Sequence, residues 1–281
     1  MKKVLFATTA LVMSAGYAAA DVTISGSANA GFKYDEGGLG YAPSKKAAAW
    51  YEIDMDVVGT IESDAGLTFG ASVDLDSDSD SDNKSQDGEV FMSGSFGTFT
   101  IGELDPIGDD YGLSDIGLDG IGVDDVAEDS SGYTTSADIR WDYAVGAVTL
   151  GVSADTVSED YDLGAKYDAG MFWGALVYSH DEDYTATMDN NSVQLTVGGS
   201  FDAFGAELYV ADSDAGDTSY GVYGSYTTGA LTLAAAYAKN DADDEGYGID
   251  AAYDLGGATV KGGVGKVMDD TVADFGVKFS F

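Results

Sequence analysis

Apolar and polar residues alternate along most of the chain in segments of about ten residues, the pattern of β-strands with one apolar and one polar face. The last segment, 272–281, shows this most clearly, with aromatic and aliphatic residues on one face and polar or small residues on the other. Segments 47–59, 135–145 and 230–239 repeat the alternation. The sequence therefore predicts an all-β protein.

The connections between these segments alternate between short glycine-rich turns and longer acidic loops. Counting both kinds gives about sixteen strands, an even number as bacterial barrels have. Merging one weakly patterned hairpin would give fourteen. The predicted strands are 21–34, 47–59, 67–75, 89–96, 98–104, 135–145, 147–155, 160–168, 171–180, 192–201, 205–211, 218–227, 230–239, 246–254, 258–267 and 272–281.

An antiparallel sheet of this length must close into a barrel or split into a sandwich. The polar face favours a barrel, because its positions carry small and charged residues that would suit a water-filled interior. The long loops all fall at one end, and tyrosines and tryptophans gather near strand ends, as they do at membrane interfaces. We predict a transmembrane antiparallel β-barrel. Its first and last strands should pair, placing the amine of Asp21 beside the carboxylate of Phe281.

The first twenty residues have the features of a cleaved signal peptide. Lys2 and Lys3 precede an apolar run, and Ala18-Ala19-Ala20 forms a cleavage site before Asp21. We therefore expect residues 1–20 to be removed and 21–281 to form a single barrel domain. No later segment is apolar for long enough to form a transmembrane helix.

Composition excludes several classes of function. The chain of 281 residues has 50 acidic and 12 basic residues, a net charge of −38, which argues against nucleic-acid binding. It has no cysteine and a single histidine, His180, so thiol chemistry and multi-histidine metal sites are not expected. Pairs of acids that could suggest a glycosidase arise from composition alone. We predict that the protein is not an enzyme.

Three stretches carry a resemblance to a known family: 67–73, 87–98 and 272–281, the last ending in Phe281. They occur in the order found in general porins of the Gram-negative outer membrane, and the chain most resembles the Rhodobacter-type porins. The resemblance implies a sixteen-stranded trimeric barrel, set in outer-membrane lipid and lipopolysaccharide, whose third loop folds inward and narrows the pore. It also implies passive diffusion of small hydrophilic solutes without a required cofactor.

The longest connection, 105–133, follows Glu103-Leu104, where the constriction loop of the family begins. It contains regularly placed apolar residues, which a fully solvated loop would not need. We predict that it is the constriction loop; the alternative is a flap outside the barrel. Its acids, the candidate constriction residues, are Asp105, Asp109, Asp110, Asp115, Asp119, Asp124, Asp125, Glu128 and Asp129.

Alternation also predicts which charged residues face the interior. A basic residue facing lipid would cost roughly 2–4 kcal/mol at mid-membrane, so the interior is the better placement. The candidate pore-wall residues are Lys33, Glu52, Asp54, Asp56, Arg140, Lys166, Lys261 and Lys278. Further interior acids are Asp74, Asp138, Asp142, Asp162, Asp168, Asp250, Asp254 and Asp274. Related porins often have arginines on the second strand, where this chain has acids, so we predict a mostly acidic, cation-preferring pore.

The run 76–83 alternates aspartate with serine. A solvated loop tip is one interpretation. The other is a structural site for Ca²⁺ or Mg²⁺, since closely spaced carboxylates repel one another unless a cation neutralises them. The candidate ligands are Asp76, Asp78, Asp80 and Asp82, and the acids of the third loop are an equally plausible cation site.

The sequence thus predicts an outer-membrane channel for the passive diffusion of small hydrophilic solutes and cations. Two alternatives stay open at this point. One is a substrate-selective outer-membrane channel, and the other is a secreted acidic β-protein that binds calcium.

Overall fold

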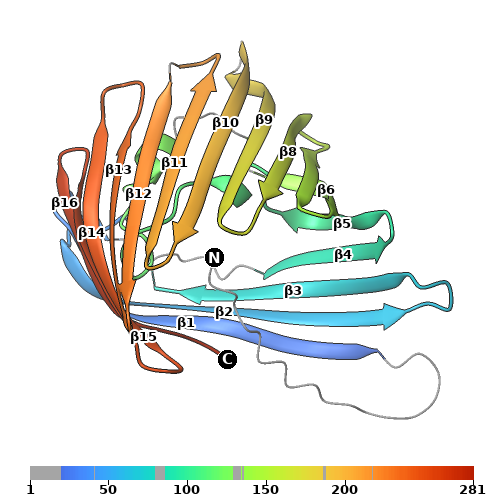
Figure 1. The fold of residues 1–281 in the computed structure, drawn as a ribbon, viewed down its shortest axis with the longest axis horizontal. Helices are drawn as coiled ribbons and strands as arrows, with labels where there is room; N and C mark the ends of the chain where they lie inside the picture. Colours follow the sequence, from blue (N-terminus) through green and yellow to red (C-terminus); the bar gives the residue numbers. More distant parts are fainter. Residues whose placement is uncertain are drawn as a thin grey trace.

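The structure is a computed structural model that describes residues 20–40, 42–79, 86–128, 134, 136–185, 188–216 and 218–281. In this part of the chain, sixteen antiparallel strands form one closed barrel, and each strand pairs with its neighbours in sequence (Figure 1). The strands are β1 (Asp21–Asp35), β2 (Ala47–Glu62), β3 (Thr68–Asp78), β4 (Gln86–Gly94), β5 (Gly97–Leu104), β6 (Ala137–Val145), β7 (Val148–Asp155), β8 (Asp160–Asp168), β9 (Phe172–Thr185), β10 (Met188–Phe201), β11 (Phe204–Ser213), β12 (Ser219–Thr228), β13 (Leu231–Lys239), β14 (Glu245–Asp254), β15 (Thr259–Val267) and β16 (Asp270–Ser280).

The barrel closes through pairing of β1 with β16, from Ser27 opposite Ser280 to Asp35 opposite Val272. Gly26 and Phe281 extend this pairing with two backbone hydrogen bonds of 3.0 and 2.9 Å. The predicted pairing of the two ends is therefore confirmed. The predicted ion pair between Asp21 and Phe281 is wrong, because Asp21 lies five residues, or roughly 17 Å, further along β1.

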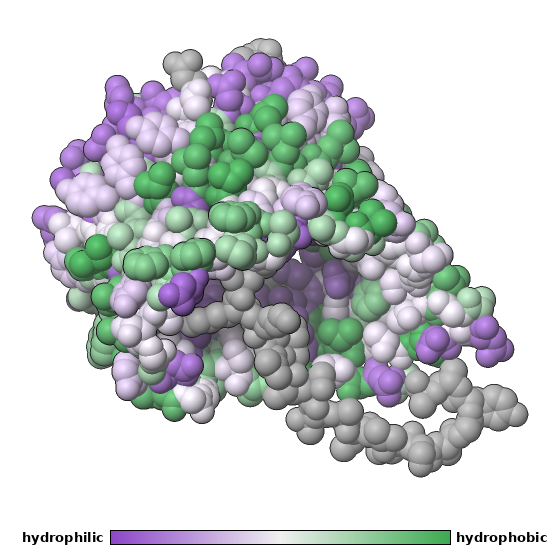
Figure 2. All heavy atoms as spheres, viewed as in Figure 1, coloured by the Kyte–Doolittle hydropathy of each residue, from purple (hydrophilic) through white to green (hydrophobic). Residues whose placement is uncertain are grey.

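The two faces of the sheet differ as the alternation predicts. Outward positions carry exposed aliphatic and aromatic side chains, such as Phe32, Ile53 and Leu176. The space-filling view shows these hydrophobic residues on the outer surface and hydrophilic ones in the hollow that opens into the barrel (Figure 2). Because the apolar residues lie outside, most of the hydrophobic surface is available to lipid.

The observed strands agree with the predicted ones, and the fold prediction is confirmed. The largest difference is at β9 and β10, which run to Thr185 and start at Met188, several residues beyond their predicted ends. Backbone pairing continues there through polar residues, so the ladder extends past the point where the apolar alternation stops. No helix among the described residues is long and apolar enough to cross a membrane. Residues 1–19 of the predicted signal peptide lie outside the described residues.

Candidate functional site: the narrowed interior of the barrel

Loop 3, the connection between β5 and β6, folds into the barrel (Figure 1). It contains a short 3-10 helix, Asp109–Tyr111, and one turn of α-helix, α1 (Asp125–Glu128). The regularly placed apolar residues are buried against the inner wall; they are Ile107, Tyr111, Leu113, Ile116, Leu118, Ile121, Val123 and Val126. The prediction of an inward-folded loop is confirmed, and these side chains supply the hydrophobic contact that holds the loop in place.

The inner wall has glycines where these apolar side chains approach it. A Cβ atom on Gly164 of β8 would lie 2.3 Å from Ile107, and one on Gly221 of β12 would lie 2.7 Å from Leu113. The remaining inner-wall glycines of this kind are Gly31, Gly151, Gly246, Gly248, Gly265 and Gly276. We call this set the glycine seat. It lets the loop lie against the backbone of the wall, which leaves the rest of the cross-section open.

Acidic side chains of the same wall accept hydrogen bonds from backbone amides of loop 3. Asp162 of β8 accepts one from Gly108 at 3.0 Å. Glu207 of β11 accepts one from Ser114 at 3.0 Å, and Asp250 of β14 accepts one from Gly117 at 3.1 Å. Asp162 and Asp250 are buried. Each of these hydrogen bonds satisfies a backbone donor that the loop would otherwise bury without a partner.

Asp274 of β16 makes the most extensive of these contacts. It accepts hydrogen bonds from Leu118 at 2.6 Å and Asp119 at 3.1 Å, and its other oxygen accepts one from Gly263 at 2.9 Å. Next to it, the Lys33 ammonium of β1 pairs with Asp119 at 2.8 Å. The middle of loop 3 is thereby attached to the first and last strands together.

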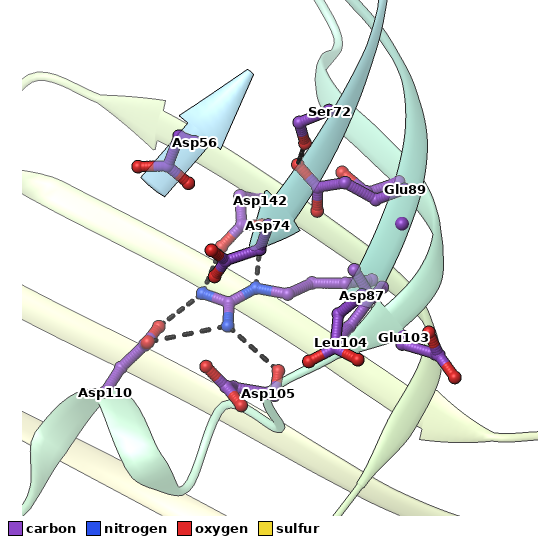
Figure 3. Close-up of a pocket in the computed structure, with 13 residues that line it drawn as sticks. Asp56, Ser72, Asp74, Asp87, Glu89, Glu103, Leu104, Asp105, Asp110 and Asp142 are labelled. Atoms are coloured by element: carbon purple, nitrogen blue, oxygen red, sulfur yellow. Dashed lines mark hydrogen bonds and ion pairs between the residues drawn. The ribbon is translucent and has the colours of Figure 1, made fainter. Parts of the chain in front are cut away.

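The start of loop 3 is held by Arg140 of β6. Its guanidinium binds both carboxylate oxygens of Asp142, at 3.0 and 3.1 Å, and pairs with Asp110 of the loop. It also donates a hydrogen bond to the carbonyl oxygen of Asp105 at 3.2 Å. Figure 3 shows the guanidinium between these groups. Two carboxylates therefore neutralise this one positive charge.

The passage left open between loop 3 and the strands β2 to β6 is lined mainly by carboxylates. A cavity of about 420 Å³ lies there, and the charged residues among its described lining are Asp56, Asp74, Asp87, Glu89, Glu103, Asp105, Asp110, Arg140 and Asp142. These are eight acids and one base. Asp110 and Asp142 contact the guanidinium of Arg140, whereas Glu103 points away from it (Figure 3). We call this cavity the acidic passage.

A larger cavity of about 1090 Å³ lies beyond loop 3, next to the short turns that join β10 to β11 and β14 to β15. Its described lining includes Lys166, Lys261 and Lys278 together with five acids. Lys261 pairs with Asp250 at 3.3 Å. We call this cavity the vestibule. It is less acidic than the passage and contains three of the predicted pore-wall bases.

Two acids of loop 3, the buried Asp124 and the half-buried Glu128, are not among the residues that line the acidic passage. Burial raises the pKa of Glu128 to about 7, and nearby Asp125 and Asp115 add to the effect. The backbone amide of Leu113 opposes it by donating a hydrogen bond to Glu128. Burial also raises the pKa of Asp124, again with help from Asp115. The raised pKa values reduce the negative charge that these two carboxyls carry near neutral pH.

The structure places the other predicted loop acids in different surroundings. Asp105 and Asp110 line the acidic passage, and Asp119 pairs with Lys33. Asp109, Asp115 and Asp125 are exposed. Asp129 lies outside the described residues. Sequence reasoning treated all nine acids as equivalent, since nothing in their spacing distinguishes a carboxylate that faces water from one beneath the loop.

The predicted pore-wall residues all lie at positions whose side chains face the interior. Glu52 accepts a hydrogen bond from Asn29 at 2.8 Å, and Asp54 accepts one from Ser27 at 2.9 Å. Lys166 lies over the rings of Trp173 and Tyr111. Sequence reasoning missed the glycine seat and Glu207; the high glycine content of interior positions after residue 145 was the available signal.

The predicted metal ligands are only partly described. Asp76 and Asp78 lie at the end of β3 opposite Asp54 and Glu52, whereas Asp80 and Asp82 are outside the described residues. Within the residues that the structure describes, no group of three or more acids or histidines is placed to hold a metal ion. A calcium site at this loop stays a prediction.

A closed barrel of sixteen strands, with polar side chains inside and a loop that narrows its interior, defines a membrane channel. The sequence profile of the Gram-negative porin family matches residues 7–272. The chain therefore belongs to the Gram-negative porins, as the resemblance indicated. This family membership decides against the secreted β-protein, and it confirms the prediction that the protein is a channel rather than an enzyme.

Solved structures with the same fold include engineered variants of a porin from Rh. blastica. A quintuple mutant is 24% identical, covers 92% of this chain and 100% of its own, and superposes with a TM-score of 0.80. A triple mutant is 23% identical with the same coverage and a TM-score of 0.79. Another triple mutant, described as Rhodopseudomonas blastica porin, is 24% identical, again with 92% and 100% coverage and a TM-score of 0.79. No curated protein sequence matches the chain.

Proposed function

We propose that this outer-membrane porin forms a water-filled, cation-preferring channel for the passive diffusion of small hydrophilic solutes and ions. One observation carries the cation preference: the acidic passage is lined by eight acids and one base among the described residues. That base, Arg140, is already bound by Asp110 and Asp142. The passage is therefore left with an excess of carboxylates facing water.

The physical basis is the field inside a narrow passage. Protein walls of low dielectric constant concentrate the field of the carboxylates, which raises the local concentration of cations and lowers that of anions. Dissolved salt screens this field, since the Debye length falls from about 30 Å at 0.01 M to about 3 Å at 1 M. The preference should thus be strong in dilute salt and weak in concentrated salt.

The test is the reversal potential of the purified porin in a planar bilayer across a KCl gradient. We expect the sign that indicates cation selectivity, with a magnitude that shrinks as both chambers are made more concentrated. A reversal potential of the anion-selective sign in dilute salt contradicts the proposal. A second measurement, the uptake of neutral and charged sugars into liposomes, would define the range of solutes.

We further propose a homotrimer whose contacts involve the outer face of β2 to β4. Outward tyrosines line both rims elsewhere, at Tyr161, Tyr178, Tyr220, Tyr237 and Tyr247 on one side and Tyr143, Tyr167, Tyr226 and Tyr253 on the other. The outer face of β2 to β4 has a single tyrosine, Tyr51, among its described residues and otherwise carries mostly small and aliphatic residues, including Gly59, Ala71, Val73, Gly88 and Val90. Interfacial tyrosines suit lipid headgroups, and a face with few of them suits another protein surface. Light scattering with detergent correction would give the oligomeric state.

Export of the protein and the lipids around the barrel are also open to test. We propose that residues 1–20 are removed, so that the mature protein begins at Asp21, and that lipopolysaccharide and outer-membrane lipid surround the faces that bear tyrosines. N-terminal sequencing of the protein recovered from outer membranes tests the first point. A mature chain beginning at Met1 would contradict it.

A further inference from the structure

Charged side chains are unevenly distributed along the axis of the pore. Loop 3 separates the acidic passage from the vestibule, and Asp110 lines both cavities at the boundary. The vestibule lies on the side of the short turns, which in bacterial barrels face the periplasm. An ion that crosses the membrane therefore meets two electrostatically different zones in series.

The vestibule bases all lie near the ends of strands on the short-turn side. Lys166 is two residues from the end of β8, Lys261 is two residues from the start of β15, and Lys278 is two residues from the end of β16. In the described part of the chain, neither Lys166 nor Lys278 has an acidic partner within ion-pair distance. The two rings packed against Lys166, with centroids at 4.7 and 5.4 Å from its ammonium, hold it in position.

The acids of the vestibule are mostly engaged by the protein itself. Asp250 is bound to Lys261 and to the Gly117 amide. Glu207 accepts a hydrogen bond from Ser114, Asp254 accepts one from Gly256 at 2.8 Å, and Asp110 pairs with Arg140. The described lining of the vestibule has five acids and three bases, whereas that of the acidic passage has eight acids and one base, so mobile ions in the vestibule experience a less negative wall.

We infer that this porin is an ionic rectifier, which conducts more current when the loop side of the membrane is positive than when it is negative. The inference rests on the cation preference proposed above. When the loop side is positive, cations leave the cation-rich acidic passage and enter the vestibule, so that carriers accumulate where the wall supplies few of them. Under the opposite polarity, cations are drawn from the vestibule into the passage faster than the vestibule can supply them. Ions therefore become depleted in the vestibule, and the current is smaller.

The experiment records single-channel currents at equal and opposite voltages in identical KCl solutions. Because the chain has no cysteine, Ser44→Cys in the connection between β1 and β2 provides a unique thiol. A membrane-impermeant maleimide added to one chamber reports which way each channel is inserted. We expect a current ratio of roughly 1.5 to 2 in 0.03 M KCl, decreasing toward one in 1 M KCl as screening shortens the range of the field.

Lysine variants test the origin of the asymmetry. Lys166→Gln combined with Lys278→Gln should bring the ratio close to one, because both zones are then acidic, whereas Lys45→Gln in an outer loop should leave it unchanged. Equal currents in dilute salt, a ratio in the opposite direction, or an unchanged ratio in the double variant would overturn the inference. Its failure is separable from that of the proposed function, because ion selectivity is measured by the reversal potential and rectification by the current ratio in symmetrical salt.

Discussion

Acidic side chains have different roles in the two halves of the inner wall. On β8, β11, β14 and β16, acids lie against loop 3, are largely buried and accept hydrogen bonds from its backbone amides. On β2 to β4, acids such as Asp56, Asp74 and Glu89 line the open passage. All of them occupy interior positions in the alternation of their strands.

The difference shows that contact with loop 3, rather than strand position, determines what an interior acid does. A carboxylate in contact with loop 3 accepts hydrogen bonds from its amides and holds the loop in place. A carboxylate that loop 3 leaves uncovered contributes its charge to the passage. Asp162, Asp250 and Asp274 were predicted as pore charges from alternation alone. The structure gives them an anchoring position instead, so the number of acids available to attract cations is smaller than the sequence indicates.

The largest effect should come from removing a covered acid. Asp274→Ala deletes the acceptor of three backbone amides, and we expect it to lower the free energy of unfolding by roughly 3–5 kcal/mol. It should also produce noisy, enlarged single-channel currents as loop 3 loosens. Asp274→Asn keeps one acceptor oxygen and should be less disruptive. Thermal unfolding and bilayer recordings measure the two effects, and a stable, quiet Asp274→Ala channel would contradict the anchoring role.

The glycine seat offers a matched pair on one strand. Gly221→Val places new atoms against Leu113, whereas a Cβ atom at Gly224, on the outer face of β12, would have only one neighbouring atom, at 4.0 Å. We expect the first to destabilise the protein by roughly 1–3 kcal/mol, the usual cost of overpacking, and to change conductance. The second should leave both unchanged. Similar behaviour of the two variants would show that loop 3 does not depend on this contact.

Neutralising uncovered acids should change selectivity without changing stability. In the triple variant Asp56→Asn, Asp74→Asn and Glu89→Gln, we expect the cation-to-anion permeability ratio in dilute KCl to fall roughly two- to five-fold, because the field in the passage weakens. The unfolding temperature should stay close to that of the native protein. A large loss of stability with unchanged selectivity would contradict the claim that these acids act on permeating ions rather than on the fold.

The raised pKa of Glu128 predicts a pH dependence. Its folded-state pKa of about 7 lies above its ordinary value of 4.5, so the folded state binds the proton more tightly than the unfolded state does. The stabilisation is therefore complete below pH 4.5 and is lost as the pH rises through 7, at a cost of roughly 1–3 kcal/mol. Glu128→Gln should flatten the melting temperature between pH 5 and 8, while Asp269→Asn, at an exposed position, should not.

The smallest effect concerns calcium. If a divalent cation offsets the acids around Asp76 and Asp78, EDTA should lower the melting temperature by a few degrees and added Ca²⁺ should restore it. Because these residues lie at the end of β3, conductance should change little. Identical melting curves with and without chelator would leave the run 76–83 as a solvated loop.

The alternation of apolar and polar residues was sufficient to predict the barrel, its closure and most strand ends, because lipid outside and water inside impose it on every strand. It also predicted the inward loop, since the apolar residues between Ile107 and Val123 needed a surface to bury against. It could not show where that surface is. The glycines of the seat are distinguished from turn glycines only once the register aligns Gly164 and Gly221 with loop 3.

The polar part of the site was less accessible to sequence reasoning for a related reason. A carboxylate paired with a backbone amide leaves no signature in the sequence, because any residue except proline can supply the amide. Arg140 could be assigned to the interior beside Asp142, two residues along the same face of β6, but its pairing with Asp110 depends on how the loop leaves β5. The pairing of Phe281 with Gly26 likewise depends on register rather than on the positions of the chain ends.

The attachment of loop 3 to β1 and β16 couples pore size to the integrity of the barrel. Among the described strands, β1 and β16 form the one pairing that is remote in sequence, and Leu118 lies across it, against Gly31 on one side and Gly276 on the other. Asp119 reaches Lys33 of β1 while its amide is held by Asp274 of β16. Loop 3 thus links the two strands whose pairing closes the barrel. Force that detaches the loop should weaken the pairing of β1 with β16, and separation of these two strands should release the loop and widen the pore.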